Sequence, residues 1–167
     1  KTANPKLTVL VDPVMGDEGR LYIPAARALA ICKQLIPLAS IITPNVWELS
    51  YLTNAAGMET DCETLVTSVS VNNQIGAEYT SSASTSVVSH EKFDSVPHGG
   101  GDALAGLFLG HLLNDQDPII SMSKAVAGVF KMMTAANDLD AGELPLIRTQ
   151  KDWADPLPLT AKTIQHD

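Results

Sequence analysis

The chain has 167 residues, of which 45% are hydrophobic and 18% are charged, and its net charge is −8. This composition indicates one soluble globular domain with a real core, and the acidic balance argues against a nucleic-acid binder, which needs a basic face. An anionic substrate would need local help from backbone donors, from Lys or Arg, or from a metal ion.

The sequence carries no signal for a membrane or for secretion. No apolar run approaches ~18 residues, so no transmembrane helix is expected, and the start "KTANPKLTVLVD" lacks the apolar stretch of a signal peptide. Cys32 and Cys62 are too few for a zinc site. We expect a cytoplasmic protein that has neither a membrane nor a nucleic acid as a partner.

The apolar pattern alternates between short strands and helices. Strands are predicted where short apolar runs lack alternation, and helices where apolar residues recur at helical spacing. In chain order, the predicted elements are a strand at 6–12, a helix within 23–40, a strand at 40–45, a helix start at 45–53, a strand at 64–69, a hairpin of 76–80 and 85–93, a helix after the glycines at 99–101, and a helix at 121–136. Ser121 is the predicted cap of the last helix.

This alternation predicts an α/β fold with a mostly parallel sheet. In such folds ligands bind at the carboxyl ends of the strands. Polar residues follow three of the predicted strands, at 12–17, 43–48 and 67–68, and the glycine run precedes a helix. We therefore expect four loops to converge on one crevice.

The stretch "HGGGD", 98–102, places three glycines and a carboxylate at a helix start. Glycines let a ligand approach the backbone closely, and the free N–H groups of a first helical turn bind anions. Asp102 could then act as a base beside a phosphate held by those amides. The alternative is a flexible loop whose Asp102 only stabilises the helix start, and composition leaves both interpretations open.

Acidic residues also follow the first predicted strand, in "DPVMGDEG". Asp12 and Asp17 could hold Mg²⁺, which binds through one or two carboxylates and keeps its waters. An ordinary turn is the alternative, because Asp, Pro and Gly are turn residues.

In "TPNVWEL", Asn45 and Glu48 are three residues apart, which puts both on one face of a first helical turn. They could hold a metal-bound water near phosphates. They could equally form a capping box, with Asn45 as the cap and Glu48 at the third helical position. The two roles are compatible.

Together, "VDPVMGDEGRLYIP", "LIPLASIITPNVWEL", "LVTSV", "HGGGDALAGLFLGHLL" and "ELPLIRTQ" resemble segments of the ribokinase-like superfamily, and within it the pyridoxal kinases. They occur in family order and cover most of the chain. The resemblance implies a three-layer α/β/α fold with a mostly parallel central sheet. It also implies ATP- and Mg²⁺-dependent phosphorylation of the 5′-hydroxymethyl group of pyridoxal, pyridoxine or pyridoxamine, with a requirement for a monovalent cation such as K⁺ left open.

The resemblance also implies roles for particular residues. Asp102 matches the catalytic base and contacts the substrate hydroxyl, and Gly99, Gly100 and Gly101 match an anion hole for the transferring phosphoryl group, with Gly100 also at the nucleotide. Tyr22 matches an aromatic position near the substrate.

The same resemblance places the metal and the nucleotide. Asn45 and Glu48 match a pair that positions Mg²⁺ through water, and Asp12 and Asp17 match the acidic motif near metal and phosphates. Thr67 and Ser68 match strand-end hydroxyls beside the nucleotide phosphates.

The sequence departs from the family pattern in two ways. Family members usually have Thr at the position of Gly100, so a hydroxyl is lost while the amide stays. The family's N-terminal half also has no counterpart here, and the helix expected between residues 52 and 64 is missing, because 58–63 is too short for a parallel crossover. We predict a single domain over 1–167 with a break in the natural chain near 58–62.

Two alternatives accompany the kinase hypothesis. A hydroxymethylpyrimidine kinase of the same superfamily shares "DPVM", but such enzymes often carry Cys at the Asp102 position. A non-catalytic nucleotide-binding remnant is favoured by Gly100 and by the missing N-terminal half. The resemblance also suggests a homodimer.

Overall fold

The computed structural model describes residues 3–4, 6–55, 57, 62–114 and 117–165. Its strands are β1 (Leu10–Val11), β2 (Gly16–Asp17), β3 (Arg20–Leu21), β4 (Ile41–Ile42), β5 (Glu63–Val71), β6 (Gln74–Thr80), β7 (Ser84–Glu91) and β8 (Lys162–Gln165). Its helices are α1 (Ala25–Ala30), α2 (Val46–Ser50), α3 (Gly100–Leu113), α4 (Pro118–Asp138) and α5 (Gln150–Trp153). α1 continues as a π-helical turn (Ile31–Leu35) and a 3₁₀ turn (Ile36–Leu38), and α2 continues as a π-helical turn (Tyr51–Ala55).

Six strands form one sheet in the order β1-β4-β5-β6-β7-β8, and β2 and β3 form a separate hairpin. β1, β4 and β5 pair in parallel, as the sequence predicts. The pairs β5–β6, β6–β7 and β7–β8 are antiparallel, so parallel pairing does not extend over that part of the sheet. For the pairs β5–β6 and β6–β7 the reason is the shortness of the turns at 72–73 and 81–83, which can only reverse the chain.

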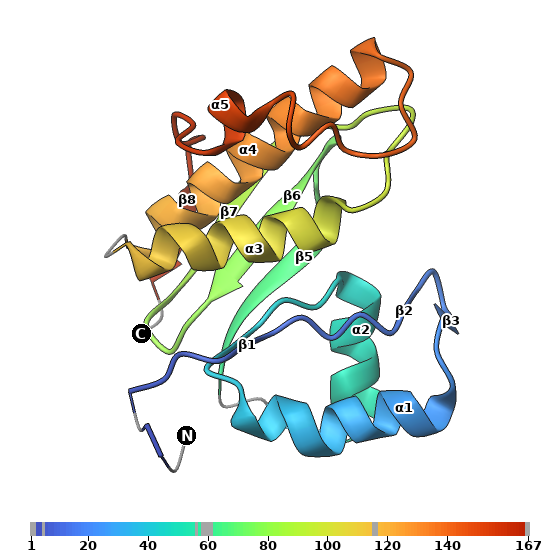
Figure 1. The fold of residues 1–167 in the computed structure, drawn as a ribbon. Coiled ribbons are helices and arrows are strands. Elements are labelled where there is room, and N and C mark those ends of the chain that lie inside the picture. The colour runs from blue at the N-terminus through green and yellow to red at the C-terminus, as the bar shows by residue number, and fades with distance from the viewer. Residues whose placement is uncertain (1–2, 5, 56, 58–61, 115–116, 166–167) are drawn as a thin grey trace.

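Helices cover both faces of the parallel part of the sheet, which confirms the α/β class. Ile41 and Ile42 are neighbours in β4 and both are buried, but they belong to different cores. Ile41 packs with residues of α3 and α4, and Ile42 packs with residues of α1 and its continuation. Figure 1 shows α3 and α4 on one side of the strands and α1 and α2 on the other. This two-sided burial is why the strand at 40–45 lacks alternation.

The crossover from β4 to β5 differs from the sequence-based expectation. The helical segment of α2 and its π-helical turn, residues 46–55, lies between the two parallel strands and provides the connection. The predicted break near 58–62 falls mainly on 58–61, which lie outside the described residues. The first strand is also shorter than the predicted 6–12, because only Leu10 and Val11 pair with β4.

The last long helix begins earlier than predicted. Pro118 is its first residue, and the cap is Asp117, whose Oδ1 accepts bonds from the backbone N–H groups of Ile119 at 2.8 Å and Ile120 at 3.3 Å. Ser121 is therefore not the cap but a buried residue inside α4. Among the described residues α4 is also the one helix long and apolar enough to cross a membrane, yet 56% of its apolar window is buried inside the structure, which is how a core helix behaves.

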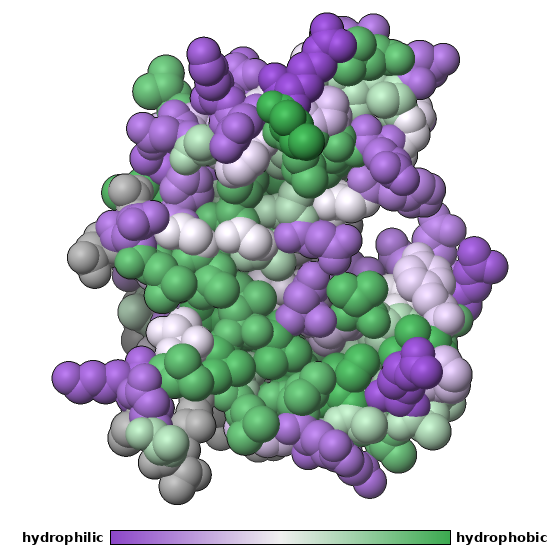
Figure 2. Space-filling view, in the orientation of Figure 1, coloured by the Kyte–Doolittle hydropathy of each residue, from purple (hydrophilic) through white to green (hydrophobic). Residues whose placement is uncertain are grey.

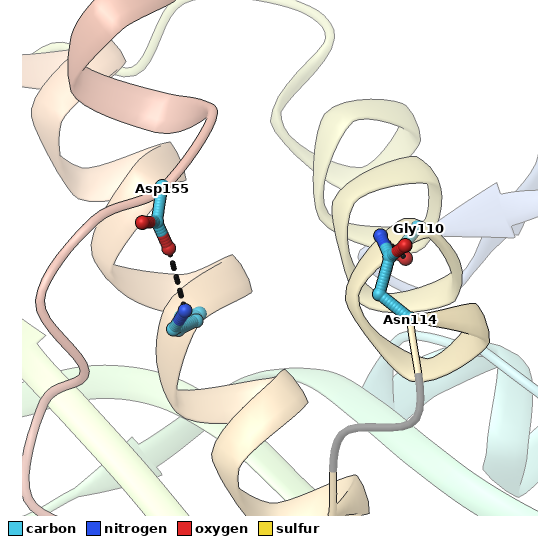
Figure 3. Close-up of polar contacts among 4 residues, drawn as sticks. Gly110, Asn114 and Asp155 are labelled. Atoms are coloured by element: carbon cyan, nitrogen blue, oxygen red, sulfur yellow. Dashed lines mark hydrogen bonds and ion pairs between the residues drawn. The ribbon is translucent and has the colours of Figure 1, made fainter.

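Short polar contacts secure the ends of the helices beyond the sheet. The Nδ2 of Asn114 donates to the Gly110 carbonyl at 2.9 Å at the end of α3 (Figure 3). Lys124 of α4 donates to Asp155 at 2.6 Å, and this bond and the Lys124 charge lower the pKa of Asp155. Because Asp155 is exposed, this pair contributes little to stability.

One face of the molecule is strongly apolar. Figure 2 shows hydrophobic side chains gathered from the later part of α3 across β1 to α1. Exposed apolar residues of these segments are Leu7, Val14, Leu29, Leu35, Leu38 and Leu113. Contiguous apolar surface of this kind marks an interaction face.

Candidate active site

The loop after β1 is held in place by the start of α2. Glu48 is only 4% exposed, and its Oε1 accepts the N–H groups of Met15 at 2.8 Å and Gly16 at 3.2 Å. Asn45 closes the arrangement, because its Nδ2 donates to the Gly16 carbonyl at 2.9 Å. Gly16 has no room for a side chain, since a Cβ would lie 2.2 Å from the Trp47 ring. The loop is therefore rigidly seated on α2.

The capping box predicted for Asn45 and Glu48 is confirmed. The Oδ1 of Asn45 accepts the N–H of Glu48 at 2.8 Å, and Oε2 of Glu48 accepts the N–H of Asn45 at 2.9 Å. Both carboxylate oxygens of Glu48 are thus bonded to backbone donors. Any role of Glu48 toward a cation would then run through water, as the resemblance implies.

Asp12 follows β1 directly and is affected by the charges of two other carboxylates. Oδ1 of Asp12 accepts a bond from the Thr43 hydroxyl at 3.0 Å. The pKa of Asp12 is raised to about 6, mainly by burial, with smaller contributions from the negative charges of Glu48 and Asp102 and against the opposing effect of the Thr43 bond. Asp102, which lies 90 residues later in the chain, is thus within electrostatic range of Asp12, in line with the predicted convergence of loops.

Asp17 and Tyr22 lie on the β2–β3 hairpin at the edge of this region. Oδ1 of Asp17 accepts the N–H of Glu18 at 2.7 Å, inside a tight turn in which Glu18 and Gly19 have positive φ. Tyr22 is 61% exposed. Within the described ranges, no group of three His, Cys, Asp or Glu side chains forms a preassembled metal cluster.

The glycine run forms the start of α3. Gly99 has a φ of 92°, a left-handed conformation suited to glycine, and caps the helix. The first helical bond runs from the Ala103 N–H to the Gly99 carbonyl at 3.0 Å. The N–H groups of residues 100–102 precede this bond and are available to an anion. Asp102 is exposed on this first turn.

A cavity of about 380 Å³ opens beside these amides. Its polar end holds Thr67, Ser68, Gly100 and Gly101, which the sequence singles out as a group. The rest of its lining comes from β6, from the end of β7 and the segment after it, and from α3 and α4: Ile75, Gly76, Ala77, His90, Lys92, Phe93, Val96, Leu104, Val126, Val129 and Met133.

Thr67 and Ser68 lie at a break in β5. The Thr67 N–H donates to the Pro44 carbonyl at 2.9 Å, and Thr67 bridges to Asn45, so the cavity borders directly on the capping box. The pairing of β5 with β6 shifts register between Val66 and Val69, and Ser68 has a φ of 60°. Such bulges redirect side chains and are frequent beside active sites. Here the bulge leaves Ser68 on the cavity wall.

The sequence did not indicate the part of the cavity lining that lies at the end of β7 and directly after it. His90, Lys92 and Phe93 line the cavity, and the rings of His90 and Phe93 also pack against Phe130, with centroids 4.8 and 5.4 Å from it. His90 therefore borders the site although no motif in the sequence singles it out. Since β7 runs parallel to β5 through the intervening β6, its end reaches the same sheet edge, and this pairing could have pointed to these residues.

The region thus consists of two adjoining parts. One part contains Asp12 and the two carboxylates whose charges act on it, Glu48 and Asp102. The other part is the cavity, with Gly100 and Gly101 at its polar end. They meet where Gly101 is followed by Asp102 and where Thr67 bridges Asn45. The geometry therefore offers an anion-binding turn, an adjacent base and a mostly apolar pocket.

Known proteins resemble this chain in sequence and in fold. Pyridoxal kinase PdxY of Corynebacterium diphtheriae is 27% identical over 175 residues, which cover 93% of this chain and 62% of that protein. The chain therefore spans about three fifths of the length of this relative.

Solved structures share the fold. Pyridoxal kinase from Entamoeba histolytica matches with a TM-score of 0.82 and 23% identity, over 98% of this chain and 64% of that one. Pyridoxal kinase from Leishmania donovani in complex with ADP and pyridoxine matches with a TM-score of 0.75 and 19% identity, over 96% and 61%. These likenesses confirm the ribokinase-like fold. The family model described as phosphomethylpyrimidine kinase matches residues 1–146, and the chain belongs to that family.

Proposed function

We propose that this protein catalyses ATP-dependent phosphorylation of the 5′-hydroxymethyl group of pyridoxal, or of pyridoxine or pyridoxamine. The observation that carries the proposal is the junction of the two parts of the site. Gly100 and Gly101 line the cavity, and Asp102 follows them directly, within electrostatic range of Asp12. A transferring phosphoryl group and the hydroxyl that attacks it need these two kinds of group side by side.

In this proposal the cavity holds the nucleotide. Its apolar walls suit a base, and its polar end, with Thr67 and Ser68, suits the phosphates. The start of α3 adds the positive end of a helix dipole. The similar Leishmania donovani structure contains ADP, which supports nucleotide binding in this fold.

The carboxylates at the end of β1 fit a divalent cation. The partly buried Asp12 is repelled by the charges of Glu48 and Asp102, and a cation bound at Asp12 would offset this repulsion. In our proposal Asp12 and Asp17 hold Mg²⁺ beside the phosphates, while Glu48 and Asn45 position its water. Mg²⁺ supplies charge neutralisation of the phosphate oxygens when bound. We do not assign a K⁺ site.

Asp102 is the proposed catalytic base. Its carboxylate accepts the proton of the substrate hydroxyl as the hydroxyl oxygen attacks the γ-phosphorus of ATP. The bond between that phosphorus and the β,γ-bridging oxygen breaks, and ADP leaves with this oxygen. The amides of residues 99–101 stabilise the charge on the transferring group. In this proposal Tyr22, whose side chain is exposed, contacts the substrate ring.

A second candidate substrate is hydroxymethylpyrimidine, because the matching family model carries the phosphomethylpyrimidine kinase description. The two can be separated by measuring kcat/KM for pyridoxal and for hydroxymethylpyrimidine with ATP, using the longest natural chain that contains this sequence. We expect preference for pyridoxal, supported by Asp102 at a position where the pyrimidine kinases often carry Cys. A higher kcat/KM for hydroxymethylpyrimidine would show that the pyrimidine is the substrate, while the proposed phosphoryl transfer from ATP would still hold.

The same assay tests the third hypothesis, a nucleotide-binding protein without turnover, which Gly100 favours. Binding of ADP without phosphorylation of either alcohol would support that hypothesis against ours.

We further propose that the protein is a cytoplasmic homodimer. The apolar face over α1, β1 and α3 supports association (Figure 2). Sedimentation velocity of the longest natural chain would show a dimer, and a monomer at micromolar concentration would contradict the proposal.

A further inference from the structure

Gly100 is in contact with the cavity wall opposite it. It lies in the first turn of α3 with a helical backbone, so its conformation alone would accept any residue. A Cβ added there would lie 2.7 Å from the terminal methyl, Cε, of Met133. Among the described residues, no other atom outside the helix's own backbone and the neighbouring residues comes within 4 Å of that Cβ. The space above Gly100 is therefore filled by one side chain from α4.

Met133 reaches this space from the cavity-facing side of α4. It follows Val126 and Val129 at helical spacing, and all three line the cavity. Its side chain is partly buried against the main core. Met is unbranched and flexible, so its end can move where a branched side chain could not. A displaced Cε can go outward from Gly100 into the open volume of the cavity.

The neighbouring glycines lack such a contact. A Cβ on Gly101 would meet nothing within 4 Å, and the same holds for Gly106 and Gly110 further along α3. Among the glycines of α3, only Gly100, at the anion-binding turn, lies against a side chain of α4. Met133 can therefore occupy its position only because residue 100 has no side chain.

We propose that Met133 is a specificity-determining residue of the nucleotide site: its methyl group rests on Gly100 and so sets the width of the cavity next to the first-turn amides. This inference rests on the proposed function, in which the cavity holds the nucleotide. Any side chain at position 100 would push Met133 into the space of the nucleotide. The pair therefore has to change together.

The test is a double-mutant cycle on ADP binding, measured by titration calorimetry in the longest natural chain. Gly100→Ala adds only the Cβ and is expected to raise the Kd of ADP about tenfold, the size of one displaced close contact. Met133→Ala removes the obstructing methyl. In the chain that carries Met133→Ala, Gly100→Ala is expected to change the Kd of ADP by less than about twofold. The effects of the two substitutions on the Kd are then not multiplicative.

Steady-state kinetics separates this role from a structural one. Gly100→Ala should raise the KM for ATP and leave the KM for the alcohol substrate unchanged. The melting temperature should not fall, because alanine is favoured over glycine in a helix. Met133→Leu keeps the volume of Met133 but loses its reach, and should also cancel the Gly100→Ala effect. Gly106→Ala is the matched control for adding a methyl to an α3 glycine outside the cavity.

The possible outcomes are distinct. Loss of ADP affinity by Gly100→Ala that persists unchanged with Met133→Ala and Met133→Leu would overturn the inference, and so would an unchanged Kd in Gly100→Ala. An unsubstituted chain that binds no ADP would overturn the proposed nucleotide site itself.

Discussion

The ionised form of Asp12 is unfavourable in the folded protein. Its carboxyl is partly buried beside Glu48 and Asp102, and its pKa is raised to about 6. The group therefore binds its proton more tightly in the folded chain than in the unfolded chain. When the pH rises from about 4 to about 6, Asp12 must ionise against this environment, and the folded state loses stability relative to the unfolded state. Above about 6 the full penalty is present.

Asp12→Asn is expected to remove this penalty. Its free energy of unfolding should exceed that of the unsubstituted chain at about pH 8, and the difference should vanish by about pH 4, where Asp12 is protonated. Urea unfolding across this range, without Mg²⁺ or nucleotide, measures it. Equal stability of the two chains at both ends of the range would show that Asp12 carries no such strain.

Ser68 is a second strained residue, with a left-handed φ of 60° at the cavity wall. Ser68→Gly should raise the free energy of unfolding by about 0.5–1 kcal/mol, because glycine adopts this conformation without strain. It should also weaken ADP binding about fivefold through the lost hydroxyl. Urea unfolding and calorimetry report the two effects.

Asn72→Gly is the matched control, since Asn72 is also left-handed, with a φ of 54°, but does not line the cavity. A lower free energy of unfolding for Ser68→Gly would show that the backbone of Ser68 is not strained. Equal weakening of ADP binding by both variants would show that the Ser68 hydroxyl does not contact the nucleotide.

At the scale of elements, α2 and the loop after β1 act as one unit. Glu48 accepts three backbone bonds from two segments that are about 30 residues apart in the chain. The capping box starts the helix, and the same carboxylate fixes the loop that carries Asp12 and Asp17. A residue explained as an ordinary cap therefore also positions the acidic end of the site.

Glu48→Gln tests this double role. The neutral amide keeps the size of the side chain but replaces one of the two accepting oxygens with an NH₂ donor that faces a backbone N–H, so we expect a loss of about 2–3 kcal/mol in the free energy of unfolding. Glu91→Gln, at an exposed position, is the control and should change it by less than about 0.5 kcal/mol. A loss in Glu48→Gln no larger than in the control would show that the loop is held by other contacts.

The sequence predicted elements best where local chemistry decides them. The capping box at 45–48 follows from residue types alone, and the two-sided burial of Ile41 and Ile42 follows from a run without alternation. The start of α4 was misplaced because Asp117 and Pro118 provide a stronger start than Ser121. The cavity walls at Lys92, Phe93 and Met133 depend on strand pairing and helix packing, which no local pattern encodes.

For the whole molecule, the family and the ribokinase-like fold follow from motifs spread along most of the chain. Since the chain spans about three fifths of the length of its relative, catalysis is best tested in the longest natural chain that contains it.

The most direct test of the account is the turnover of Asp102→Asn in that chain. We predict that kcat for ATP-dependent formation of pyridoxal 5′-phosphate falls by about 10²–10⁴-fold, the contribution of a positioned general base. The Kd of ADP should stay within about threefold, since the amides that bind phosphate remain. Turnover within about tenfold of the unsubstituted chain, with ADP binding intact, would contradict the assignment of Asp102 as the base.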